Sequence, residues 1–240
     1  MPTPHIIQVD SIQNLPGIVD NLDLGQDRPT MVLVGGASKV SPEDFERIRL
    51  LFFEVLAPLA EELGLTIVDG GTDAGIMQLI GQARAKMSGT FPLIGVAPKG
   101  LVDLPNQPAP CPDSAPIEQH HTHCILIPGS EWGDESPWIA QVATLVAKGQ
   151  PSVAVLINGG EVTWKDAQAN VDLQRPVVVI AGSGRTADVL AEALLGLSVT
   201  DQRAQPLVKS GLLQRMDLKQ PMTTLAHQLK GLFCTEVSSV

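Results

Sequence analysis

The residues of this 240-residue chain that are best suited to chemistry gather in one short stretch, residues 181–188, which reads Ala-Gly-Ser-Gly-Arg-Thr-Ala-Asp. Its glycines expose backbone N–H groups, and the helix predicted to follow adds partial positive charge from its dipole, so the stretch predicts an anion site. Arg185 stands in the first turn of that helix, where a cation is unfavourable unless an anion is present. We therefore expect Arg185 to contact a phosphate, with a structural ion pair as the alternative. The ligand-binding residues predicted from this stretch are Gly182, Ser183, Gly184, Arg185 and Thr186.

Three further glycine pairs follow apolar runs, and each pair is expected to leave a strand of the same sheet. One pair alone is explained by the freedom of glycine to adopt a left-handed turn. In a parallel sheet, however, all such turns lie on the carboxyl edge, where open α/β folds bind ligands. The sequence therefore predicts a cleft for a phosphate or pyrophosphate with its nucleoside. Its predicted contacts are Gly35, Gly36, Gly70, Gly71, Thr72, Asn158, Gly159 and Gly160.

Apolar runs that alternate with helical patterns must position these turns. Such alternation implies right-handed crossovers between parallel strands. We predict an α/β, Rossmann-like, doubly wound, mainly parallel sheet of about six or seven strands, with helices on both faces. Residues 1–29 are expected to be an accessory segment with a short extra strand, residues 30–197 the ligand domain, and residues 198–240 a C-terminal helical extension packed on the domain or on a partner subunit. The stretch 97–122 holds six prolines and is expected to be a lid or a surface connection.

Composition excludes several classes of partner. The formal net charge of −10 argues against a broad basic surface for nucleic acid or an anionic membrane, whereas glycine turns can bind a small phosphorylated ligand without net protein charge. Three cysteines at irregular spacing suggest neither a disulfide framework nor a zinc ribbon. The N-terminal residues do not resemble a signal peptide and no apolar stretch is long enough for a bilayer span, so we expect a cytoplasmic protein.

Two polar candidates keep alternative roles. His123 is expected to stack on or bond the ligand, or else to be a solvated or capping histidine; its place at the start of a strand favours the opposite edge of the sheet. His121 and His123 could share a metal, but the sequence supplies no convincing third and fourth ligand, so no metal site is predicted. Asp188 could hold Arg185, contact a ribose hydroxyl, or act as a catalytic carboxylate.

Two motifs carry a resemblance to a known superfamily. Residues 70–77, Gly-Gly-Thr-Asp-Ala-Gly-Ile-Met, resemble the Gly-Gly-Gly-x-x-Gly-Leu-Met motif of the Lonely Guy, or lysine decarboxylase-like, phosphoribohydrolases, and residues 181–188 are similar to their Pro-Gly-Gly-x-Gly-Thr-x-x-Glu motif. A closer resemblance is to the LSDAT branch of the SLOG superfamily. An ordered set of six motifs carries it: Val-Gly-Gly-Ala, Asp-Gly-Gly-Thr-Asp-Ala-Gly-Ile-Met, Ile-Gly-Val-Ala-Pro, His-Thr-His, Asn-Gly-Gly and Gly-Ser-Gly-Arg-Thr-Ala-Asp. That branch occurs at the N-terminus of TRPM channels and in free-standing prokaryotic proteins, and the resemblance covers about Thr30 to Leu197.

The resemblance implies a sensor or binding domain for a nucleotide-derived molecule such as ADP-ribose, an NAD-related compound or a cyclic nucleotide. Such a domain would require no cofactor besides its nucleotide-derived ligand, and the resemblance implies an effector protein encoded elsewhere as a partner. We also expect a homo-oligomer. The alternative is a nucleoside 5'-monophosphate phosphoribohydrolase. Arg185 and Asp188 stand where the hydrolase motif has Thr and Glu, and an arginine suits a bidentate phosphate contact better than a hydrolytic role.

Overall fold

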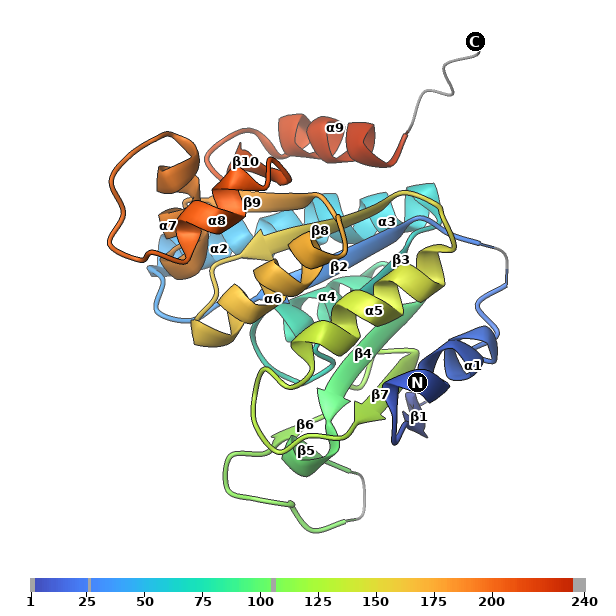
Figure 1. Ribbon diagram of the computed structural model, residues 1–240. Coiled ribbons are helices and arrows are strands. Elements are labelled where there is room, and N and C mark those ends of the chain that lie inside the picture. Colours follow the sequence, from blue (N-terminus) through green and yellow to red (C-terminus); the bar gives the residue numbers. More distant parts are fainter. Residues whose placement is uncertain (1–2, 26, 105–106, 235–240) are drawn as a thin grey trace.

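The central feature of the computed structural model is one eight-stranded sheet in which every pair of neighbouring strands is parallel (Figure 1). The structure describes residues 3–25, 27–104 and 107–234. The strand order is β1-β7-β4-β3-β2-β8-β9-β10. The strands are β1 (His5–Gln8), β2 (Thr30–Gly35), β3 (Thr66–Asp69), β4 (Leu93–Pro98), β7 (His123–Ile127), β8 (Ser152–Ile157), β9 (Val177–Ala181) and β10 (Leu213–Asp217).

Helices cover both faces of this sheet, as Figure 1 shows. One face packs against α1 (Leu15–Asp20), α5 (Ser136–Ala147), α6 (Glu161–Asp172), α7 (Arg185–Leu194) and α8 (Ala204–Lys209). The other face packs against α2 (Pro42–Leu50), a π-helical segment (Leu51–Leu56), α3 (Ala57–Leu63), α4 (Gly75–Lys86) and α9 (Met222–Phe233). Two separate apolar cores therefore enclose the sheet, which confirms the prediction of a doubly wound parallel α/β fold.

The central strands are apolar on both faces, which is why the sequence identified them. Every residue from Val177 to Ala181 is buried, and the same holds for Thr66 to Asp69. Alternate side chains of a strand point to opposite faces, so such a strand serves both cores at once.

The sheet has eight strands, whereas about six or seven were predicted. Its two edge strands come from segments outside the predicted ligand domain. β1 pairs with β7, and β10 pairs with β9. The segment 198–240, predicted as helical, thus contains a strand as well as α8 and α9. Gln214 and Arg215 are exposed in the middle of β10. An edge strand needs less apolar surface than a central one, and this polarity hid it from the hydrophobic pattern.

The direction of chain growth reverses between β2 and β8. From β2 the chain proceeds to β3, β4 and β7 on one side, and then returns to β8 on the other side of β2. Helices lie on opposite faces on the two sides of such a point, so a crevice opens at the carboxyl ends of the two strands. The fold therefore places Gly35-Gly36 and Asn158-Gly159-Gly160 beside this crevice.

The proline-rich segment after β4 contains a short 3-10 helix (Lys99–Leu101) and a small parallel pair of β5 (Val102–Asp103) and β6 (Ala115–Pro116), at the bottom of Figure 1. Residues 105–106 of this segment lie outside the described residues. Across the described parts of the chain, no helix combines the length and the apolar character that a bilayer crossing demands.

Candidate functional site

A cavity of about 270 Å³ lies at the carboxyl edge, next to the crevice between β2 and β8. Backbone of four predicted glycines forms part of its wall: Gly35 and Gly36 after β2, Gly70 after β3, and Gly160 before α6. The first turn of α6 and Arg185 complete the polar side. Larger hollows elsewhere on the molecule contain none of these glycine turns. The cavity is therefore the place where the sequence motifs and the geometry agree.

Two of the glycines are required by close packing around the cavity. A Cβ on Gly35 would lie 1.9 Å from the carbonyl oxygen of Ile157, and the residue has a φ of +122°. A Cβ on Gly160 would lie 2.7 Å from the Arg185 guanidinium. Any side chain at Gly35 would collide with backbone, and one at Gly160 would displace the arginine. Both glycines thus keep the end of the cleft open to a ligand.

Arg185 is the cation of this wall. Its guanidinium donates a hydrogen bond from Nη1 to the Ser38 hydroxyl over 2.9 Å, and its φ of +56° is unusual for a residue that is not glycine. Within the described residues the guanidinium has no carboxylate partner, so the predicted alternative of a structural ion pair is not what the structure shows. Backbone strain is common at functional sites, where the surrounding structure holds a residue in an unfavourable conformation.

Asn158 and Ser183 hold the two glycine turns together from beneath. The buried Asn158 donates through Nδ2 to the Ser183 carbonyl over 2.8 Å, and the Ser183 hydroxyl accepts from the Asn158 N–H over 2.7 Å. The Ser183 hydroxyl in turn donates to the Ile180 carbonyl. Both side chains were predicted as ligand contacts, but their observed bonds fix the turns instead. The Asn158 Oδ1 is buried without a partner in the described structure.

Several other predicted contacts also have structural roles. The Thr186 hydroxyl donates to the Gly160 carbonyl, and a Cβ on Gly159 would collide with Thr163. A Cβ on Gly71 would lie 2.7 Å from the Cα of Gly95, so Gly71 permits a close approach of two backbones. Thr72 forms an antiparallel bridge with Ile117, and a Cβ on Gly184 would lie 2.9 Å from Asn158 Nδ2. None of these five predicted residues lines the cavity.

Asp188 lies outside the cavity, at the turn after β9, and not where a catalytic carboxylate at the cavity would have to be. Its Oδ1 accepts the Gly182 N–H over 2.6 Å, and both residues line a separate surface hollow with Arg215. The carboxylate therefore caps the turn after β9. Neither Asp188 nor Gly182 lines the cavity of Arg185.

His123 lies at the amino end of β7, and its ring centroid is 5.9 Å from that of His5 on β1. Burial lowers its pKa, and the neighbouring His5 lowers it further. The prediction that His123 contacts a ligand at the carboxyl edge is wrong, because the carboxyl and amino ends of parallel strands lie on opposite edges of the sheet. Within residues 3–25, 27–104 and 107–234, no group of three or more His, Cys, Asp or Glu side chains could hold a metal ion.

The fully buried His121 bridges two carboxylates instead of facing a metal. Its Nε2 lies 2.8 Å from Asp69 Oδ1, and its Nδ1 lies 2.8 Å from Glu118 Oε2. Burial alone would lower the pKa of His121, but the two carboxylates raise it to about 9, so the ring is charged at neutral pH. Asp69 also accepts the Gly71 N–H. This array fastens the end of the proline-rich segment to the turn after β3, and no described residue of 97–122 lines the cavity.

Two acidic side chains that were not predicted as site residues line the same cavity as Arg185. Glu135, just before α5, and Asp166, on α6, both line the cavity, and each is 7% exposed. Burial, with a smaller contribution from the neighbouring Glu135, raises the pKa of Asp166 to about 7 despite a 2.6 Å hydrogen bond from the Ser136 hydroxyl. Burial also raises the pKa of Glu135. The sequence holds no motif at Asp166; only its spacing of three residues from Thr163 places the two on one face of α6, and both are buried.

Comparison with known proteins agrees with this architecture. A family model described as "SLOG in TRPM, prokaryote" matches residues 28–226. Among curated relatives, a transient receptor potential cation channel subfamily M member-like 2 protein of Nematostella vectensis is 27% identical over 184 residues, and the subfamily M member 2 channel of Mus musculus is 24% identical over 205 residues. These matches cover 61% and 70% of this chain but only 12% and 14% of the channels.

Two solved structures share the fold. A structural genomics target, TM1055, superposes with a TM-score of 0.56 at 17% identity and covers 85% of this chain and 99% of its own. The molybdenum cofactor binding protein of Rippkaea orientalis superposes with a TM-score of 0.57 at 14% identity and covers 88% of this chain and 100% of its own. At such identities the likeness extends to the fold alone.

Proposed function

Since this chain belongs to the family described as "SLOG in TRPM, prokaryote", we propose that it binds a nucleotide-derived ligand as a sensor domain, with the phosphate held at the carboxyl edge. The proposal is carried by the environment of Arg185. Its guanidinium lines the cavity beside the glycine wall and has no carboxylate partner among the described residues. Candidate ligands are ADP-ribose, NAD-related compounds and cyclic nucleotides.

The physical basis for phosphate binding is local and does not depend on net charge. α6 begins at the cavity with Gly160 as its N-cap, so the positive end of its dipole faces the same space as the guanidinium. Glycine backbone on the opposite side permits close approach of phosphate oxygens to N–H groups. An anion there would also relieve the repulsion between a helix N-terminus and the cation of Arg185. A protein with a net charge of −10 can bind a phosphate by such means.

The hydrolase alternative gains no support from Asp188, which caps the turn after β9 and does not line the cavity. We therefore propose binding without N-glycosidic cleavage. Incubation with a panel of nucleoside monophosphates should release no free base. Base release that depends on Asp188 would overturn this part of the proposal.

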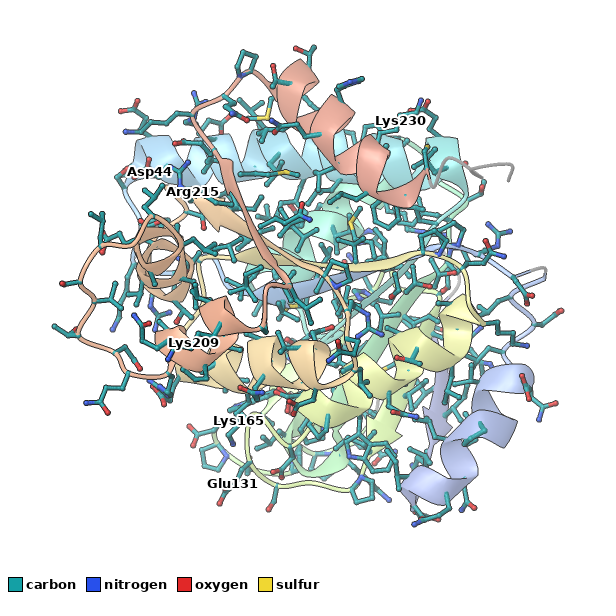
Figure 2. The ribbon with its side chains drawn as sticks, turned by 45° about the horizontal axis from the view of Figure 1, so that its top comes forward. Asp44, Glu131, Lys165, Lys209, Arg215 and Lys230 are labelled. Carbon is teal, nitrogen blue, oxygen red and sulfur yellow. The ribbon has the colours of Figure 1, made fainter. Side chains whose placement is uncertain are left out.

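The test is calorimetric titration of the protein with ADP-ribose, NAD, AMP and cyclic dinucleotides. At least one ligand should bind, and Arg185→Ala should weaken it about tenfold or more, because a charge-assisted hydrogen bond to phosphate contributes about 1.5–3 kcal/mol. Arg215→Ala is the matched control, since Arg215 lies on β10 (Figure 2), pairs with Asp217 and does not line the cavity. Binding of none of these compounds, or equal loss in both variants, would refute the proposal.

A further inference from the structure

The acidic wall of the cavity has no role in phosphate binding and would oppose it. Glu135 and Asp166 come from different elements, the residue before α5 and the middle of α6, yet both line the cavity of Arg185 and both are 7% exposed. Buried carboxyls are rare unless they are paired or hydrogen-bonded, because removing a charge from water is costly. The protein supplies only part of the hydrogen bonds that these two carboxyls can accept.

The hydrogen bonds of Asp166 are incomplete. Its Oδ1 accepts from the Ser136 hydroxyl over 2.6 Å, whereas its second carboxyl oxygen has no hydrogen-bond partner in the described part of the chain. Glu135 accepts the Gly133 N–H through Oε2 over 2.8 Å. The second oxygen of Asp166 is not among the fully buried atoms that lack a partner, so it is accessible from the cavity. A ligand that brings hydroxyl donors to this wall could therefore donate to it.

The surroundings disfavour the ionised form of both carboxyls. Burial and the neighbouring Glu135 raise the pKa of Asp166, and burial and the neighbouring Asp134 raise the pKa of Glu135. Lys165 of α6 acts in the opposite direction on both. Lys165 passes over the Gly133 turn, and Figure 2 shows it at the same margin of the molecule as Glu131 of that loop. Binding of two O–H donors would favour the ionised form, because a carboxylate accepts stronger hydrogen bonds than a neutral acid.

The dimensions of the cavity relate the acidic wall to Arg185. A volume of about 270 Å³ corresponds to a sphere roughly 8 Å across, so cation and carboxyls face one small space. In a nucleoside 5'-phosphate the phosphate is separated from the ribose 2'- and 3'-hydroxyls by only part of one sugar ring. The remaining wall is apolar, formed by Leu33, Val34 and Ile139, and suits the face of a base.

We propose that Glu135 and Asp166 form a subsite for a ribose diol, in which they accept hydrogen bonds from the 2'- and 3'-hydroxyls of a ribosyl 5'-phosphate held by Arg185. This inference rests on the proposed function and narrows it to ligands with an unmodified ribose next to the bound phosphate. The exocyclic amine of a base is the competing donor. It lies beyond the sugar, at a greater distance from the phosphate than the hydroxyls.

The test compares 5'-AMP with 2',3'-dideoxyadenosine 5'-monophosphate by calorimetric titration at pH 8. The wild-type protein should bind 5'-AMP at least about tenfold more tightly. Asp166→Asn and Glu135→Gln should each remove most of this discrimination, because an amide replaces a charged acceptor. Asp172→Asn is the matched control: Asp172 lies on the same helix as Asp166, but it is exposed and does not line the cavity. It should leave the discrimination within about twofold.

Different failures have different meanings. Equal binding of the two nucleotides to the wild-type protein, with binding still lost in Arg185→Ala, would overturn the diol subsite and leave the proposed function intact. Discrimination that survives in both Asp166→Asn and Glu135→Gln would do the same. If those variants instead lose a preference for AMP over inosine 5'-monophosphate, the carboxyls recognise the base amine and the inference is wrong. Binding of neither nucleotide nor of the wider panel would refute both proposals.

Discussion

The buried carboxyl of Asp166 should destabilise the folded protein in a pH-dependent way, and Asp166→Asn should remove this penalty. The pKa of Asp166 is raised from 3.8 to about 7 by burial, so the folded state binds its proton more tightly than the unfolded state does. Between these two values the unfolded state gains stability by ionisation and the folded state does not. The contribution of Asp166 to the stability of the wild-type protein should therefore fall as pH rises from about 4 to about 7, and then stay level.

The magnitude follows from the difference of the two pKa values. At 1.36 kcal/mol per unit, the full penalty above pH 8 is about 4 kcal/mol, of which roughly 2 kcal/mol is already present at pH 5.5. The stability of Asp166→Asn relative to wild type should therefore increase by about 2 kcal/mol between pH 5.5 and pH 8.5. Asparagine keeps an oxygen that can accept from the Ser136 hydroxyl, so any constant offset between the two proteins cancels in this comparison.

Urea unfolding of both proteins at pH 5.5, 7.0 and 8.5 measures this difference. The control is Asp172→Asn, on the same helix but exposed, which should show a pH-independent difference of no more than about 0.5 kcal/mol. If the relative stability of Asp166→Asn is the same at pH 5.5 and pH 8.5, then Asp166 ionises normally in the folded protein, and the account of its burial given above is refuted.

Two further predictions concern the elements that shape the site. The pKa of His121 in the folded protein is raised to about 9, so its contribution to stability is complete below pH 6.5 and is lost as pH rises through 9. The free energy of unfolding of the wild-type protein should therefore fall by about 3 kcal/mol across this window. His121→Gln should lack that fall when both proteins are unfolded in urea. Gly35→Ala should destabilise the protein by more than about 3 kcal/mol in thermal unfolding, because its Cβ would collide with the Ile157 carbonyl. The control is Gly17→Ala in α1, where the space around the glycine is open. It should be neutral or stabilising by up to about 1 kcal/mol. Equal effects of the two alanines would contradict the steric argument.

The sequence predicted the centre of the fold because the central strands are apolar on both faces and end in glycine. Val177 to Ile180 is a continuous apolar run, and Leu65 to Val68 is interrupted only by the β-branched Thr66. A run of that length with a glycine turn is typical of a parallel strand inside a doubly wound sheet. β10 lacked this signal, because an edge strand exposes Gln214 and Arg215 to solvent. The number of strands therefore depended on tertiary pairing that local patterns do not encode.

The same limit applied to the site. Gly35, Gly36, Gly70, Gly160 and Arg185, all predicted as ligand contacts, line one cavity, because the topology of a parallel sheet brings its carboxyl turns to one edge. The remaining predicted contacts follow strands as well, but whether a glycine faces a cavity or a neighbouring backbone depends on the twist of the sheet. Asp166 lies in the middle of a helix, where no motif marks it. Only the packing of α6 against α5 shows that this carboxyl and Glu135 share one cavity.

The two expectations for Asp166→Asn have opposite signs, and their combination tests the assignment of the cavity more strictly than either alone. A carboxyl that served only packing would be replaced by asparagine with a gain in stability above pH 7 and no change in ligand discrimination. A carboxyl that served only the ligand, with ordinary ionisation, would lose discrimination without any gain in stability. A ribose subsite built from a buried acid should show both effects, because the unfavourable burial and the unused hydrogen-bond acceptor are properties of the same side chain. The stability gain in Asp166→Asn would also demonstrate that its loss of discrimination occurs in a folded protein.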